Sequence, residues 1–104
     1  MAGLGKFLKQ AQKMQEQMQR IQDELAAREV EGSAGGGAVK AVARCDGSLV
    51  SIKIDPKVVD PKDVEMLEDL VLSAVTNALE VAKKTQSDEM AKVTAGMNIP
   101  GMNS

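Results

Sequence analysis

An apolar repeat in the first 28 residues constrains this chain more than any other feature. Apolar side chains recur at alternating steps of three and four residues, at Leu4, Phe7, Ala11, Met14, Met18, Ile21 and Leu25. This is an uninterrupted a/d heptad pattern, and most positions between are Gln, Lys, Glu or Arg, which favour helix. It predicts a helix from Leu4 to Arg28, about 25 residues and roughly 37 Å long. Such a helix is too long to cover only a small sheet, so part of it should protrude or pair with another helix.

A glycine-rich run separates this helix from two alternating segments. Gly35, Gly36 and Gly37 are consecutive and prevent the helix from continuing, which predicts a flexible connector. A phosphate-cradling loop is the alternative, but the Lys-Ser/Thr pair of such loops and their strand–loop–helix setting are missing. Residues 39–45 and 49–55 alternate apolar and polar side chains, and Asp46-Gly47 between them favours a tight hairpin turn.

A third strand completes the predicted sheet. In the second run Val50, Ile52 and Ile54 share one face. Residues 29–34 can add a short edge strand before the glycines, so the pattern predicts a three-stranded antiparallel meander.

A second helix should follow the sheet. Asp60-Pro61-Lys62-Asp63 places an Asp at the N-cap and a Pro at the first helical position. Apolar residues then recur with helical period, which predicts a helix running to about Gln86 or as far as Ala95. Its small residues, Ala74, Ala78 and Ala82, would let another backbone approach closely. Residues 96–104 show no period, so we expect a single domain at 1–95 and a disordered tail at 96–104.

The order of elements predicts an α+β fold, α-β-β-β-α, with the meander between two long helices. The chain has 104 residues with one Phe and no Trp or Tyr, so its core must be aliphatic. A chain of this length is only marginally able to bury a core, and dimerisation would offer a second buried surface.

Composition argues against catalysis. The chain has no His, so imidazole bases and His–metal sites are excluded, and a single Cys45 cannot form an internal disulfide or a CxxC metal site. Asp55, Asp60 and Asp63 could mimic an oxygen-rich cation site, but strand-end and helix-start capping are the simpler roles. We therefore expect no enzyme activity, cofactor, metal or small-molecule substrate.

The lone thiol suits a reducing compartment, and the chain has no run of about 20 apolar residues. These features predict a cytoplasmic protein that does not span a membrane.

Charge is distributed unevenly along the chain. The formal net charge is −2, yet residues 1–28 hold five basic residues and three acidic ones. With Leu4 at heptad position a, Lys6, Lys13 and Arg20 occupy position c and Lys9 occupies position f. These four residues form a basic stripe opposite the apolar positions, and the first two helical turns contain no acid. The stripe predicts contacts with duplex phosphates and weak sequence preference.

An alternative interpretation treats the lysines as a solvated face. The heptad helix would then dock a partner helix, and the protein would be an interaction adaptor.

Several sequence motifs, taken in their order along the chain, also resemble those of a known family. They are Lys-Gln-Ala-Gln-Lys-Met-Gln at 9–15 with Met18 and Gln19, the glycine-rich stretch 31–40, Ile-Asp-Pro at 54–56 with 65–70 and 74–78, and Ile-Pro-Gly-Met at 99–102. Together they cover nearly the whole chain, which resembles the YbaB/EbfC family of bacterial nucleoid-associated proteins.

The resemblance implies an α-β-β-β-α fold and an intertwined homodimer whose long helices project like tweezers. It also implies a cytoplasmic, nucleoid-associated protein that binds double-stranded DNA, alters DNA conformation, and takes part in gene regulation and DNA protection.

The candidate residues combine the resemblance with the stripe. The family places its binding regions on the helices, and Lys9 and Lys13 match the first-helix motif, while Lys6 and Arg20 come from the stripe. Lys83 and Lys84 are the candidates on the second helix. The apolar seam, expected in the core or the dimer interface, comprises Leu4, Phe7, Met14, Met18, Ile21 and Leu25.

Overall fold

The computed structural model describes the backbone of residues 2–102 and the side chains of residues 3–93. Its elements are α1 (Ala2–Ala27), β1 (Glu29–Ala34), β2 (Val39–Arg44), β3 (Leu49–Ile54), the short 3-10 helix η1 (Pro56–Val58) and α2 (Val64–Met102). The strands form one antiparallel sheet in the order β1-β2-β3. The predicted α+β fold, α-β-β-β-α with a three-stranded meander, is therefore confirmed.

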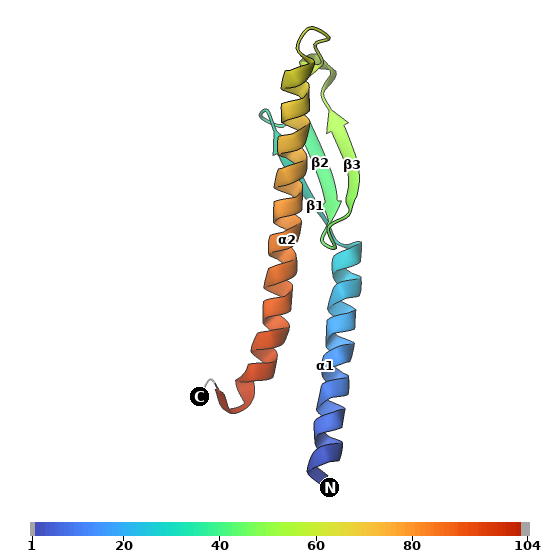
Figure 1. Cartoon of the computed structure of the whole chain (residues 1–104), viewed down its shortest axis with the longest axis vertical. Helices are drawn as coiled ribbons and strands as arrows, with labels where there is room; N and C mark the ends of the chain where they lie inside the picture. The colour runs from blue at the N-terminus through green and yellow to red at the C-terminus, as the bar shows by residue number, and fades with distance from the viewer. Residues whose placement is uncertain (1, 103–104) are drawn as a thin grey trace.

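The molecule is long and thin, with extents of 74 × 25 × 15 Å. One end holds the sheet, and α2 runs along it and continues beside α1 toward the end where the N-terminus lies (Figure 1). The two helices are antiparallel, because the chain climbs through α1 to the sheet and returns through α2.

Small side chains form the packing contact between α2 and the sheet. Val39, Ala41 and Ala43 of β2 are fully buried, and the α2 residues that cluster with them are Ala74, Ala78 and Ala82. A spacing of four places the α2 alanines on one stripe of the helix. The predicted close approach of another backbone to these alanines is confirmed.

The closest approach is at Gly32 of β1. A Cβ built there would overlap the backbone nitrogen of Ala78 and lie 2.6 Å from the carbonyl oxygen of Ala74. Beside it, the Asn77 side-chain amide donates a hydrogen bond to the Ser33 carbonyl at 2.9 Å. The side-chain amide and the close contact together fix the position of β1 along α2.

β3 extends beyond the cover of α2. Ile52 and Ile54 lie opposite Ala41 and Val39 in the register, so their side chains share the inner face of the sheet. A shift in register between Val42 and Ala43 leaves Val50 unpaired with β2 within the described strands. The apolar strip of β3 remains 38–44% exposed; it consists of Leu49, Val50, Ile52 and Ile54.

α2 begins later than the sequence pattern predicts. Asp60 accepts the Lys62 N–H at 2.9 Å in a separate turn, which the Asp63 N–H closes onto the Asp60 carbonyl. Asp63 accepts the Met66 N–H at 3.2 Å and so caps the helix that starts at Val64. The prediction of Asp60 as N-cap is wrong, because its side chain stabilises its own turn three residues upstream.

The predicted hairpin turn lies in the connection between β2 and β3. It spans residues 45–48, with Gly47 at φ +96°. The Asp46 carboxylate accepts the Ser48 N–H at 2.9 Å and the Ser48 hydroxyl at 2.6 Å. The Gly47 N–H also donates to the Arg44 carbonyl at 2.9 Å, so the hairpin turn expected at Asp46-Gly47 is present.

α2 also ends later than expected, since its backbone is helical to Met102 rather than to a point between Gln86 and Ala95. A single glycine such as Gly96 lowers helix stability by about 1 kcal/mol without forbidding a helix. The division into a domain at 1–95 and a disordered tail at 96–104 stays a prediction, and residues 103–104 lie outside the described part of the chain.

Candidate nucleic-acid interface

The N-terminal half of α1 projects from the body of the molecule. Leu25 is buried near the sheet, and Met18 and Ile21 are half-buried, whereas Phe7 is 68% exposed and Leu4 is 59% exposed. The burial of the seam thus falls toward the N-terminus. Residues 3–13 form what we call the α1 arm.

The basic stripe lies on the side of α1 turned away from the seam. Lys6, Lys9, Lys13 and Arg20 are all exposed. The first helical turn has no acidic residue, and the first acid in the sequence is Glu16. A helix N-terminus carries a partial positive charge that adds to that of the lysines. The structure therefore places Lys6, Lys9 and Lys13 on one exposed basic face that an external polyanion could contact. Arg20 lies at the edge of this face, where α1 lines a groove toward α2.

Lys83 and Lys84 do not join this face. Both are exposed on α2, but at about 100° per residue they lie roughly 100° and 200° around the helix from the buried Ala82. The residues of α2 that line the groove toward α1 come from the next two turns, at Glu89, Lys92 and Val93. The two lysines therefore lie apart from the basic stripe.

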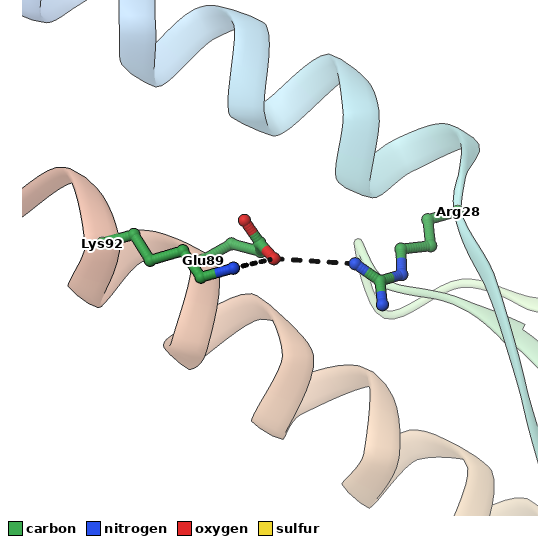
Figure 2. A network of polar contacts seen from close by, with 3 residues as sticks. All are labelled: Arg28, Glu89 and Lys92. Atoms are coloured by element: carbon green, nitrogen blue, oxygen red, sulfur yellow. Dashed lines mark hydrogen bonds and ion pairs between the residues drawn. The ribbon is translucent and has the colours of Figure 1, made fainter.

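A shallow groove separates α1 from α2. Its α1 side is lined by Gln17, Arg20 and Ile21. Across it, one oxygen of the Glu89 carboxylate lies 3.2 Å from the Lys92 ammonium and 3.6 Å from the Arg28 guanidinium (Figure 2). The Arg28–Glu89 ion pair therefore connects the end of α1 to α2.

Sequence reasoning missed Lys92 as a neighbour of Arg20. The helical period of α2 was the signal that could have found it. When that period is extended past Gln86, Lys92 follows Glu89 by three residues and lies on the side of α2 that faces α1.

The aspartates considered for a cation site serve the backbone instead. Asp55 accepts the Lys57 N–H at 3.0 Å, and Asp60 and Asp63 accept the N–H groups already described. Among the described residues, no three or more Cys, Asp or Glu side chains gather in a way that could hold a metal ion. The same part of the chain contains no helix with the length and apolarity needed to cross a bilayer.

The carboxyl group of Asp46, in the β2–β3 loop, has a shifted pKa. The hydroxyl of Ser48, followed by its backbone N–H, donates to Asp46 and holds the pKa of Asp46 below its ordinary value. Cys45 beside it is a buried free thiol. Neither residue lies on the basic stripe, so both belong to the scaffold.

Known proteins are similar to this chain in fold and in sequence. The crystal structure of an uncharacterized protein from Helicobacter pylori matches with a TM-score of 0.73 at 18% identity, over 90% of this chain and 96% of that one. A nucleoid-associated protein of Caldanaerobacter subterraneus subsp. tengcongensis is 54% identical over 99 residues, covering 95% of this chain and 89% of the relative. Another, from Moorella thermoacetica, is 52% identical over 101 residues and 97% of each chain. The sequence pattern of one family matches residues 1–97 and confirms the resemblance seen in the motifs. The chain belongs to the YbaB/EbfC DNA-binding family.

Proposed function

We propose that this protein binds double-stranded DNA as a homodimer and alters the conformation of the DNA, without enzymatic activity. The observation that carries the proposal is the exposed basic stripe on α1, which has no acid before Glu16. The family and the nucleoid-associated relatives support it. In the cell the protein organises the nucleoid in the cytoplasm and contributes to the regulation of gene expression.

Phosphate contact is the mechanism that the stripe supports. Lysines at positions 6, 9 and 13 present ammonium groups to the DNA backbone, and each neutralised phosphate releases counterions and adds salt-dependent affinity. Such contacts position the protein without reading bases. The single Phe7 lies on the seam, so base stacking on an aromatic surface has no place in this mechanism.

The apolar strip of β3 supports the homodimer. Soluble monomers rarely leave contiguous apolar patches uncovered, and here Ile52 and Ile54 continue the inner face beyond α2. A second copy that covers the strip would complete the core and supply a second α1 arm. Two arms on one duplex can change its path.

Duplex binding at several salt concentrations tests the proposal. Lys6→Gln, Lys9→Gln and Lys13→Gln are combined in one variant, and Lys57→Gln/Lys62→Gln serves as a control that removes charge away from the stripe. We expect the slope of log affinity against log salt to fall by about 0.9 for each lost phosphate contact. Affinity that responds neither to salt nor to the triple substitution would exclude the stripe.

The exposed seam favours a second candidate function, a protein-interaction adaptor. Leu4, Phe7 and Leu8 are 55–68% exposed on the α1 arm and could dock a partner helix. A stoichiometric protein partner that survives nuclease treatment, together with no duplex binding at physiological salt, would favour the adaptor.

A further inference from the structure

The face of the sheet opposite α2 carries basic side chains that do not belong to the stripe. Residues of β2 alternate, so that burial of Val39, Ala41 and Ala43 against α2 turns Lys40 and Arg44 to the outer face. Lys53 of β3 lies on the same face, directly opposite Lys40 in the register. Both lysines are exposed, and in the described part of the chain neither helix packs over this face (Figure 1).

Two like charges in direct register are unfavourable without a counter-charge. Side chains paired in this way have Cβ atoms about 4.5–5.5 Å apart, and like charges at that distance destabilise a sheet. The third member of the row is Ser33 of β1, opposite Lys40, so the row contains no acid. Both ion pairs found among the described residues involve Glu89, and neither includes Lys40 or Lys53.

Two of the acids on this face lie at its other end. Glu29 is opposite Arg44, and Glu31 is opposite Val42. Positive charge is therefore partly balanced near the β2–β3 loop. At the end of the sheet that holds the glycine turn, Asp55 follows Lys53 by two residues, and its carboxylate accepts the Lys57 N–H at 3.0 Å. The two lysines of the row exceed this one carboxylate in charge.

That turn leaves the row open to a large ligand. The Cε of Lys40 would lie 3.9 Å from a Cβ built on Gly37, so the lysine side chain extends along the turn. A Cβ on Gly36 would meet nothing within 4 Å, and both glycines have positive φ. Bare backbone beside two ammonium groups and a hydroxyl suits a polyanion with phosphates, because no side chain of the turn holds it away.

We propose that Ser33, Lys40 and Lys53 form a second phosphate-contact row, which binds a segment of duplex DNA other than the one on the α1 arm. This inference rests on the proposed function. At 1.5 Å per residue, Lys6 lies about 33 Å along α1 from the start of the sheet. Two duplexes, one across the arm and one across the row, therefore have room to bind at once, and each subunit connects two DNA segments.

A bridging assay tests the row. One random-sequence duplex is fixed to beads, and capture of a second, fluorescent random-sequence duplex is measured with the full-length protein. Lys40→Gln/Lys53→Gln should reduce capture at least fivefold while retaining most binding to a single duplex in a gel shift. Lys57→Gln/Lys62→Gln, which removes the same charge elsewhere, should capture like the wild type.

The variant should also be at least as stable as the wild type without DNA, because it removes the repulsion between Lys40 and Lys53. Capture by Lys40→Gln/Lys53→Gln equal to wild type would overturn the row and leave the proposed function intact. A wild type that shifts a duplex but captures no second one would also overturn the row and leave the proposed function intact. A wild type that shifts no duplex would overturn both the function and the row.

Discussion

Gly32 of β1 and Ala78 of α2 are in such close contact that one added carbon on Gly32 would overlap the backbone nitrogen of Ala78. The neighbours that this carbon would meet are backbone atoms of α2, which cannot move aside like the end of a flexible side chain. The sheet can take up its position on α2 only with glycine at this point.

Gly32→Ala should therefore destabilise the protein by about 3 kcal/mol or more, at the upper end of overpacking effects. Urea unfolding measures the change. Gly5→Ala is the matched control, because a Cβ on this helical glycine meets nothing within 4 Å. The control should gain about 0.5–1 kcal/mol from the better helix propensity of alanine. Equal stability of Gly32→Ala and wild type would contradict the described contact.

Asp63→Ala should weaken the start of α2. Its carboxylate accepts the Met66 N–H, and loss of such a cap costs about 0.5–2 kcal/mol. Asp60→Ala removes an equal charge and a bond within the preceding turn only, so it should cost less. Thermal unfolding of the two variants compares them directly, and a larger loss for Asp60→Ala would restore Asp60 as the cap.

Ser48→Ala should raise the pKa of Asp46 toward its ordinary value of 3.8. The hydroxyl of Ser48 is the main cause of the lowered pKa. A lowered pKa in the folded state contributes stability that is complete above the unfolded pKa and is lost as pH falls through the folded pKa. The wild type should therefore lose this contribution below about pH 3.8, and the variant should keep only the part that the Ser48 backbone N–H and the smaller causes provide. Carbon-13 NMR titration of the Asp46 carboxyl checks the shift; an unchanged pKa would assign it to the other donors.

Ile52→Asp should produce monomers at micromolar concentrations where we expect the wild type to sediment as a dimer. The substitution places a charge on the apolar strip that the second copy is expected to cover. Ser51→Asp is the control, because this residue points to the outer face of the sheet. The melting temperature of the wild type should also rise with protein concentration. A monomeric wild type under these conditions would rule out the homodimer.

Strands were predictable because their chemistry is local. Small apolar residues alternate with Lys and Arg through 39–44. The structure has β1 at the predicted residues, and β2 and β3 each end one residue earlier than predicted. The start of α2 was not predictable in the same way. Asp60 and Asp63 both suit an N-cap, and the choice between them depends on which turn each side chain stabilises.

The part of the candidate site that lies on the single helix α1 was predictable. Helical period alone places Lys6, Lys13 and Arg20 on one face. The opposition of Lys40 and Lys53 depends on how β2 is aligned with β3, and a shift of one residue would move either lysine to the other face. The uneven burial of the seam depends on how closely α2 approaches each turn of α1, which is a tertiary property.

The alanine contact between α2 and the sheet has a thermodynamic consequence. Alanine and glycine have no rotamers to lose, so Ala74, Ala78 and Gly32 are ordered without a cost in side-chain entropy. They also remove little apolar area from water, and the heat capacity of unfolding scales with that area. This contact should add little curvature to the stability curve, so its contribution to stability changes only slightly with temperature.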